Sequence, residues 1–199
     1  LCAIRYPRGG EKANFNGEAG LKAAKAIYNI MNHPAWVNDS GVPSAESDVR
    51  ATIGGTWDIA KFKEFYGDNY GCAVMPTVTV DGETKNLGCF VGGKSFGVKP
   101  QVSKGDPDRL VAAHELARLL SDKDAQVKRY ENYGIGPCHS EAKKHPNMVN
   151  DPNMIVLAAQ AQFGHPQDAV PAAFWTAPTT FVGGIADGTI TLENIQEAI

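Results

Sequence analysis

The stretch Ile53–Ile59, IGGTWDI, leads from a short apolar run through two glycines into Trp57 and the start of a helical pattern. A tryptophan side chain has an area of about 150 to 250 Å² and one N–H donor, so at an exposed helix start it forms a flat platform with a polar edge. Such a platform suits the C–H face of a sugar ring. The alternative is a core tryptophan that covers the helix end. The residues alone leave both interpretations open.

A second tryptophan has a comparable setting in the stretch 170–178, VPAAFWTAP. Trp175 stands where a loop meets another expected helix, and the same two interpretations apply to it. Its neighbour Phe174 is expected in the core.

The segments around Trp57 alternate between expected strands and expected helices. Ala51–Ile53 predicts a short strand, and Trp57–Tyr66 predicts a helix that Gly67 can end in a left-handed conformation. The run 69–77, NYGCAVMPT, predicts a buried strand stopped by proline, and the run 90–93, FVGG, leads into another strand. Alternation of this kind indicates the α/β class.

The rest of the chain predicts further elements of both kinds. Asp81-Gly82 between alternating residues is a strong hairpin signal over 78–84, and Asp106-Pro107 is typical of a capped helix start. The other expected elements are strands over 1–6 and 94–99 and helices over 17–32, 107–120, 126–133, 152–163 and 192–199, the last capped by Thr191.

In this order the segments resemble the carboxy-terminal half of an extracellular solute-binding protein of the maltose/maltodextrin-binding type. That family has a Gly-x-Trp helix start, then Tyr-Gly-x-x-x-x-Pro and then Phe-Val-Gly-Gly, which match residues 55–57, 70–76 and 90–93. The resemblance continues through Tyr133–Pro137 to the Pro-Ala-Ala-Phe-Trp cluster. The family's first strands and glycine-rich turns have no counterpart, so the resemblance implies a fragment of a longer precursor.

The resemblance implies a fold and a function. The fold is a periplasmic-binding-protein-like three-layer α/β lobe, with residues 1–76 in the carboxy-terminal lobe, 77–150 in a crossover and a late segment of the amino-terminal lobe, and 151–199 back in the first lobe. The function is that of a receptor for an ABC-type sugar importer, which captures a mono- or oligosaccharide in an inter-lobe cleft. The implied partners are this carbohydrate and the permease membrane subunits. The implied location is extracellular or periplasmic, with a lipoprotein anchor in the full-length precursor.

Three candidate binding residues lie in the first half of the chain. By resemblance, Trp57 matches a tryptophan that stacks on sugar. Asp58 could accept a hydrogen bond from a sugar hydroxyl, although an acid in the first turn of a helix is also explained by the helix dipole. Trp36 follows a helix in HPAWV and is a candidate either for the cleft rim or for packing.

Three more candidates lie near the carboxyl end. By resemblance, Trp175 matches a second stacking tryptophan. Thr176 and Thr179 stand where the family often has an aromatic residue and an arginine, which weakens the expectation of maltodextrin as the ligand.

Composition fits a globular receptor and excludes several other classes. The 199 residues are 43% hydrophobic and 21% charged, and the net charge of -3 gives no reason to expect nucleic acid or an anionic membrane as a partner. No apolar run approaches the roughly 20 residues that span a bilayer. No cofactor or metal motif is found. Four cysteines, Cys2, Cys72, Cys89 and Cys138, allow three full disulfide pairings, and Cys72 and Cys89 are expected as small buried residues.

Two alternatives to a sugar receptor remain open. The same fold could bind a non-sugar solute such as a polyamine, a peptide or a metal chelate. A thiol-dependent enzyme could use Cys138 and His139, but no Gly-x-Ser-x-Gly, His-Glu-x-x-His or phosphate-binding glycine loop is present, so the chain is predicted not to be an enzyme.

Self-association is a further expectation. The helix over 107–120 has an apolar face of Leu110, Leu116, Ala117 and Leu120. The resemblance implies that this helix and the strand over 94–99 lose their native partners along with the missing lobe. Unpaired edges and apolar patches recruit other chains.

Overall fold

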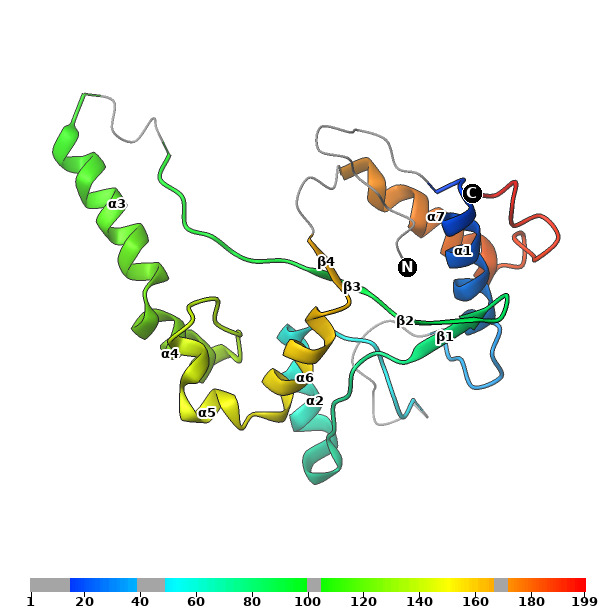
Figure 1. The fold of residues 1–199 in the computed structure, drawn as a ribbon, viewed down its shortest axis with the longest axis horizontal. Helices are drawn as coiled ribbons and strands as arrows, with labels where there is room; N and C mark the ends of the chain where they lie inside the picture. Colours follow the sequence, from blue (N-terminus) through cyan, green and yellow to red (C-terminus); the bar gives the residue numbers. More distant parts are fainter. Residues whose placement is uncertain (1–14, 39–48, 100–104, 167–171) are drawn as a thin grey trace. The chain divides into compact units, whose positions relative to one another are not determined.

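The computed structural model of the chain describes residues 15–38, 49–99, 105–166 and 172–199 (Figure 1). Its residues group into two compact units. Unit 1 contains Leu1–Gly41, Val74–Val91 and Gln160–Ile199, and unit 2 contains Val42–Ala73 and Gly92–Ala159. The strand expected over 1–6 lies outside the described residues.

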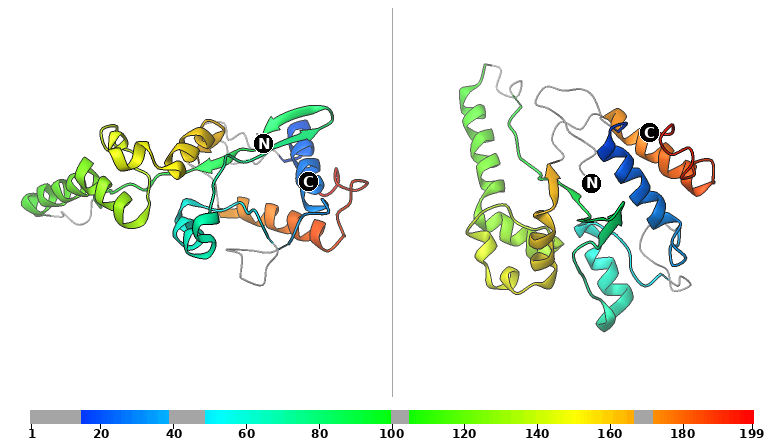
Figure 2. Two further views of the ribbon diagram at one scale, coloured as in Figure 1. Left: turned by 90° about the horizontal axis from the view of Figure 1, so that it is seen from below. Right: turned by 45° about the vertical axis from the view of Figure 1, so that its right-hand side comes forward.

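Unit 1 is built on helix α1 (Glu18–Met31), which confirms the helix expected over 17–32. Small residues line its inner face, and Ala23, Ala24 and Ala26 are buried. Helix α1 contacts both strand β1 (Thr77–Val80) and helix α7 (Thr176–Ala186), and the two views of Figure 2 show α1 and α7 side by side. Small side chains on α1 permit this close approach of neighbouring elements.

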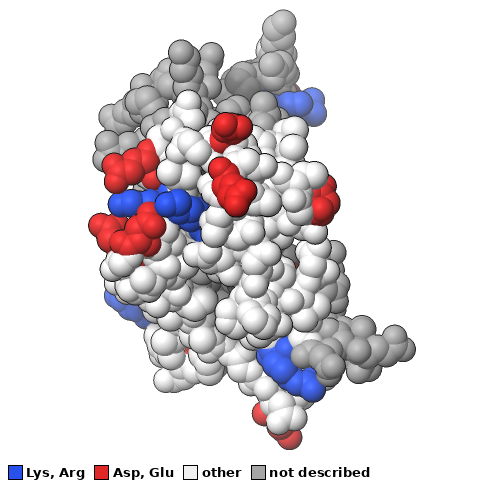
Figure 3. Space-filling view, turned by 90° about the vertical axis from the view of Figure 1, so that its right-hand side faces the viewer, with Lys and Arg blue, Asp and Glu red and all other residues white. Residues whose placement is uncertain are grey.

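The expected hairpin is present in unit 1. Strands β1 and β2 (Glu83–Asn86) pair antiparallel around Asp81 and Gly82, whose φ angles of 50° and 80° are those of a turn that favours Asp-Gly. Two ion pairs join the hairpin to α1, Lys22 to Glu83 and Lys25 to Asp81, each at 3.3 Å. Figure 3, which views the right-hand side of Figure 1, shows acidic and basic side chains next to each other.

Unit 1 contains a second small sheet, and its first strand follows the hairpin in the sequence. Strand β3 (Cys89–Val91) pairs in parallel with β4 (Gly164–Pro166). Glycine is needed at position 164, because a Cβ there would lie 2.1 Å from a methyl group of Val91. Strand β3 contains the Phe90-Val91 of the FVGG run and ends there, so the prediction that this run leads into another strand is wrong.

The buried side chain of Gln160 holds this part of unit 1 together. Its Oε1 accepts from the backbone N–H of Met75 at 2.8 Å, and its Nε2 donates to the carbonyl of Leu87 at 2.9 Å. Both ends of the amide are thus satisfied, as burial of a polar group requires.

The carboxyl end of unit 1 differs from the prediction. A 3-10 turn, η5 (Ala172–Trp175), leads into α7, but the helix expected over 192–199 is absent and the chain forms turns instead. The side chain of Asn194 accepts from the N–H of Thr191 at 2.7 Å and donates to the carbonyl of Thr189 at 2.9 Å. These bonds offer the backbone an alternative to a helix.

Unit 2 begins with the segment that carries Trp57. A 3-10 turn, η1 (Thr56–Asp58), opens α2 (Ile59–Tyr66), and a second turn, η2 (Gly67–Asn69), follows it. The strands expected at Ala51–Ile53 and within 69–76 are wrong, because these segments pair with no other strand in the described part of the chain. Cys72, expected to be buried in the second of them, is exposed.

Side-chain caps define the helices in the rest of unit 2. Asp106 accepts from the N–H of Arg109 at 3.0 Å and opens α3 (Pro107–Ser121), as predicted. Helix α4 (Lys123–Tyr133) begins three residues before the predicted Gln126, because Asp122 caps it by accepting from Ala125 at 2.9 Å. Gly134 ends α4 in the left-handed conformation. The remaining elements are η4 (Ala142–Lys144), α5 (Pro146–Val149) and α6 (Pro152–Ala161), the last of which continues into unit 1.

The segment 94–99 is extended but is not a strand, so that prediction is wrong. Phe96 lies 5.1 Å from the guanidinium of Arg129 on α4. The segment and one face of α3 line a shallow apolar groove formed by Phe96, Gly97, Val98, Lys99, Ala113, Leu116, Ala117 and Leu120. The groove is open, and no residue of α3 is buried.

Candidate aromatic binding sites

The indole of Trp57 is among the exposed aromatic side chains of unit 2, with 80% of its surface accessible. It is therefore not a core residue in the described structure, and its role as a binding platform stays a prediction. The short turn η1 places it just before α2, and the N–H of Asp58 donates to the carbonyl of Gly55 at 3.0 Å to close that turn. The six-membered part of the indole lies directly against the backbone of Gly55.

Asp58 sits beside this platform and is partly shielded from solvent. Its carboxylate lies 3.7 Å from the ammonium of Lys61, one helical turn further along. A pair of this kind at the surface contributes little to stability, about 0.3 to 0.5 kcal/mol on a helix. The carboxylate therefore keeps its capacity to accept a hydrogen bond from a ligand hydroxyl, with its charge partly offset by Lys61.

Trp175 has a different environment in unit 1. Its ring stands edge-on to Phe174 at 5.1 Å and to Phe90 at 5.4 Å, and 44% of its surface is accessible. Phe174 is buried, as predicted, and it stacks on Phe15 at 5.4 Å. Trp175 therefore combines both interpretations, since part of its ring packs in an aromatic cluster and part faces outward.

The two threonines after Trp175 are exposed on α7. The hydroxyl of Thr179 donates to the carbonyl of Trp175 at 2.8 Å, so its only proton is engaged within the helix. Thr179 can still accept a hydrogen bond from a ligand. Thr176 is exposed at the first position of α7.

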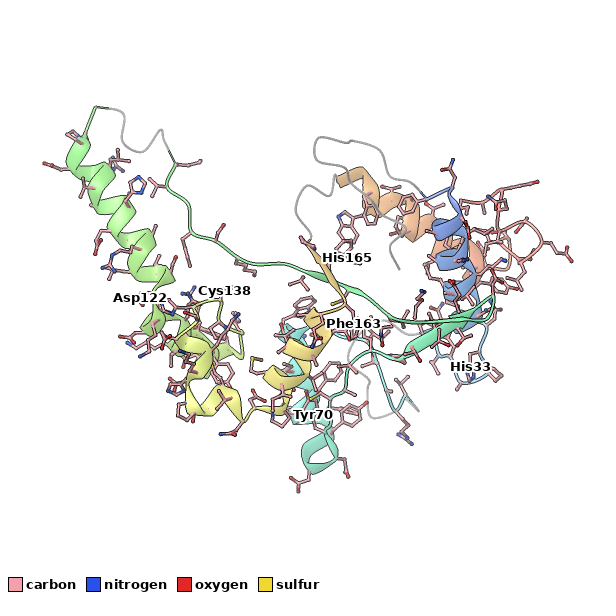
Figure 4. The ribbon with its side chains drawn as sticks, in the orientation of Figure 1. His33, Tyr70, Asp122, Cys138, Phe163 and His165 are labelled. Carbon is pink, nitrogen blue, oxygen red and sulfur yellow. The ribbon has the colours of Figure 1, made fainter. Side chains whose placement is uncertain are left out.

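Trp36 lies in the loop after α1, also in unit 1. Its N–H donates to the carbonyl of His33 at 2.8 Å, and the ring of His33 accepts from the N–H of Ala35 at 3.1 Å. Figure 4 labels His33 at this end of α1. With Asn29 and Ile30 these residues line a shallow surface depression. Trp36 is about half exposed, and its place at a cleft rim stays a prediction.

The six candidates thus fall into two groups. Trp57 and Asp58 belong to unit 2, and Trp36, Trp175, Thr176 and Thr179 belong to unit 1. Within its own unit, each group offers an aromatic surface and hydroxyl or carboxylate acceptors.

Sequence reasoning missed a polar network in unit 2 that stabilises the chain just after the Trp57 helix. The hydroxyl of Tyr70 donates to Oδ1 of Asn153 at 2.5 Å, and the side-chain and backbone N–H groups of Asn153 donate to Oδ1 of Asp151 at 2.8 and 2.9 Å. The hydroxyl of Tyr130 lies 2.8 Å from both Oδ2 of Asp151 and the carbonyl of Asn147. The Asp-Pro helix start at 151 was a signal for the cap, but nothing in the sequence indicated its tyrosine partners.

The electrostatics of this network follow from its burial and its hydrogen bonds. Burial and the hydrogen bond to Asp151 raise the pKa of Tyr130 to about 12. Burial is the largest cause that raises the pKa of Tyr70, and the nearby Cys72 and Asp151 raise it further. Burial alone would raise the pKa of Asp151, but the hydrogen bonds from Asn153 and Tyr130 outweigh it, and the pKa is lowered.

The Cys138-His139 pair does not have the geometry of a nucleophile and its base. Both backbone N–H groups donate to Oε1 of Gln126, at 2.7 and 2.9 Å, and Cys138 is exposed. The Nδ1 of His139 accepts from the N–H of Glu141 at 3.2 Å, so this nitrogen serves the local turn. Figure 4 shows Cys138 beside the segment that follows α4.

Within the described ranges, no group of three or more His, Cys, Asp or Glu residues could hold a metal ion. No helix in these ranges is long and apolar enough to cross a membrane.

The chain belongs to the family of bacterial extracellular solute-binding proteins, whose sequence model matches residues 8–156. Among solved structures, it is similar to the maltodextrin binding protein MalE1 from L. casei BL23 without ligand, with a TM-score of 0.68 and 21% identity over 92% of this chain and 50% of that chain. This likeness shows the fold and confirms the predicted α/β, periplasmic-binding-protein-like class. The chain spans about half the length of that protein. Comparison with curated proteins gives no match.

Family membership also decides between a receptor and an enzyme. The family is one of solute-binding proteins and not of enzymes, which confirms the prediction against catalysis. The resemblance to the maltose/maltodextrin-binding type is confirmed at the level of family and fold.

Proposed function

We propose that this chain is the carbohydrate-binding part of a receptor for an ABC-type importer, and that it captures a mono- or oligosaccharide. The observation that carries the proposal is the indole of Trp57, which is 80% accessible at the start of a helix. An exposed indole is a large, rigid, apolar surface with one N–H donor at its edge. A sugar ring offers the apolar C–H face that such a surface accommodates.

The energy of one stacking contact sets what the rest of the site must supply. About 100 Å² of apolar area at about 25 cal/mol per Å² contributes about 2 to 3 kcal/mol. Micromolar binding requires about 8 kcal/mol. Further contacts are therefore needed, and within unit 2 we propose Asp58 as one of them. Trp36, Trp175, Thr176 and Thr179 are proposed binding residues of unit 1.

Charge favours a neutral ligand over the alternatives. A polyamine site needs acidic groups with no cationic neighbour, whereas Asp58 lies 3.7 Å from Lys61. A metal chelate or a charged peptide would require balancing charges around the tryptophans. Trp175 is instead surrounded by Phe90 and Phe174.

The proposal extends to partners and location. We assign the chain to an extracellular or periplasmic receptor whose full-length form delivers its ligand to the permease subunits and carries a lipoprotein anchor. The assignment of residues 1–76 and 151–199 to the carboxy-terminal lobe, and of 77–150 to a crossover and a late segment of the amino-terminal lobe, is part of the same proposal.

We also propose that the chain associates with itself, because the apolar groove of α3 and segment 94–99 is open to solvent. A second copy of the chain is the proposed occupant. An apolar helix face of this kind is stabilised when another chain covers it.

Calorimetric titration of the 199-residue chain with maltose and longer maltodextrins, and in parallel with spermidine and a neutral peptide, tests the proposed function. We expect heat of binding with the saccharides and none with the other two solutes. Trp57→Ala should weaken saccharide binding. The control is Tyr133→Ala, because Tyr133 is an aromatic of the same unit with 71% of its surface accessible. Equal losses in both variants, or binding of spermidine alone, would refute a sugar site at Trp57.

A further inference from the structure

The backbone at Gly55 gives no reason for a glycine at this position. Its φ of -94° and ψ of 164° are those of an ordinary extended residue, which any amino acid adopts. Glycines with positive φ, such as Gly67 at 53°, are explained by conformation, and Gly55 is not one of them. The absence of a side chain at position 55 must therefore have another physical reason.

That reason is the indole of Trp57. A Cβ at position 55 would lie 2.2 Å from Cζ2, 2.3 Å from Cε2 and 2.4 Å from Cη2 of Trp57. These separations are far shorter than the 3.5 to 4.0 Å at which carbon atoms make their best contact. Since the indole is rigid, one added methyl group would force the whole ring away from its present orientation.

We propose that Gly55 is a positioning residue, which holds the indole of Trp57 in one orientation through contact with part of one face of its six-membered ring. The ligand ring then stacks on the opposite face. This inference rests on the proposed function, because it deepens the role of the Trp57 platform. A fixed ring lowers the cost of binding, since no rotamer has to be immobilised when the ligand arrives.

Two other glycines provide comparisons. Gly54, next in the chain, would bring a Cβ to 3.0 Å from the ring of Phe62, so it is unsuitable as a neutral control. Gly71 lies in the same unit, has no positive φ, and would bring its Cβ within 4 Å of no other atom. Gly71→Ala is therefore the matched control for Gly55→Ala.

The first measurement concerns the orientation of the indole and needs no ligand. In a background with Trp36→Phe and Trp175→Phe, Trp57 is the only tryptophan, so its near-ultraviolet circular dichroism and its quenching by acrylamide report on this ring alone. Gly55→Ala should change both signals, and Gly71→Ala should change neither. Unchanged signals in Gly55→Ala would overturn the inference. Far-ultraviolet circular dichroism confirms that each variant is folded.

The second measurement concerns the ligand and uses all three native tryptophans. Gly55→Ala should weaken maltodextrin binding by at least about fivefold, and Gly71→Ala by less than twofold. In a Trp57→Ala background, Gly55→Ala should have no further effect on affinity, since the ring that it displaces is gone. A loss that persists in that background would mean that Gly55 acts elsewhere, and the positioning role would be wrong.

The two measurements separate the inference from the function on which it rests. If the unmodified chain binds no saccharide, the proposed function fails, and the ligand-facing part of the inference fails with it. The spectroscopic result then still decides whether Gly55 orients the indole. If the ring moves in Gly55→Ala and saccharide affinity stays the same, the proposed function stands and the positioning role is overturned.

Discussion

The hydroxyl of Tyr70 donates a hydrogen bond of 2.5 Å to Oδ1 of Asn153, which is 83 positions away in the sequence. This bond joins the segment that follows α2 to the first turn of α6. Asn153 is 6% accessible, so its amide has no access to bulk water as an alternative partner. The contact is therefore a principal link between two parts of unit 2.

Tyr70→Phe should lower the free energy of unfolding by about 1 to 3 kcal/mol, because it leaves the buried amide oxygen of Asn153 without its donor. Urea denaturation of the two proteins measures the difference. Tyr133→Phe removes a hydroxyl from a tyrosine that is 71% accessible and should change the free energy by less than about 0.5 kcal/mol. Equal effects would show that the Tyr70 hydrogen bond does not stabilise the fold.

Stability should fall in acid through Asp151. The folded state lowers the pKa of this carboxyl below its unfolded value of about 3.9, so the carboxylate stabilises the fold above that pH. This contribution is lost as the pH falls through the folded pKa. Asp151→Asn should therefore reduce the difference between the urea midpoints at pH 7 and pH 3.

Asp187 in unit 1 adds a separate acid-sensitive contribution, because hydrogen bonds from Thr189 lower its pKa. Some loss of stability at pH 3 should accordingly remain in Asp151→Asn. A variant with the full pH dependence of the unmodified chain would contradict the role given to Asp151.

The two tryptophans should respond differently to replacement by alanine. Trp57→Ala should weaken saccharide binding by about 1 to 3 kcal/mol and leave the melting temperature without ligand nearly unchanged, because the indole is 80% accessible. Trp175→Ala should also lower the free energy of unfolding by about 2 kcal/mol, because it removes edge contacts to Phe90 and Phe174. Melting curves and calorimetry on the same samples test both expectations. A large drop in melting temperature for Trp57→Ala would be inconsistent with a free platform.

Association through the apolar groove should be disrupted by a charge on α3. Leu116 lines the groove, and Leu116→Glu should shift the chain towards monomer in light scattering at micromolar concentration. Leu192→Glu places the same charge at an exposed leucine of unit 1 and should leave the mass unchanged. A monomeric unmodified chain would rule out this interface.

Local signals in the sequence determined most of the helices and the hairpin. The Asp106-Pro107 start of α3 and the Asp81-Gly82 turn act through bonds and dihedral angles within a few residues, so they need no distant partner. The order of these segments also carried the resemblance to the family to which the chain belongs. Trp57 was found as a candidate for the same reason, since a Gly-x-Trp helix start is a local pattern.

Tertiary structure alone decided which extended segments became strands and which polar groups met. The segments 51–53 and 94–99 were predicted as strands but pair with no strand in the described part of the chain, whereas Cys89–Val91 pairs with Gly164–Pro166. A strand is defined by hydrogen bonds to a neighbour, and no pattern within a segment supplies that neighbour. The bond between Tyr70 and Asn153 and the contact of Gly55 with the Trp57 ring likewise depend on side-chain placement in three dimensions. Sequence thus determined the local elements and the candidate platform, and tertiary packing determined the partners and the orientation.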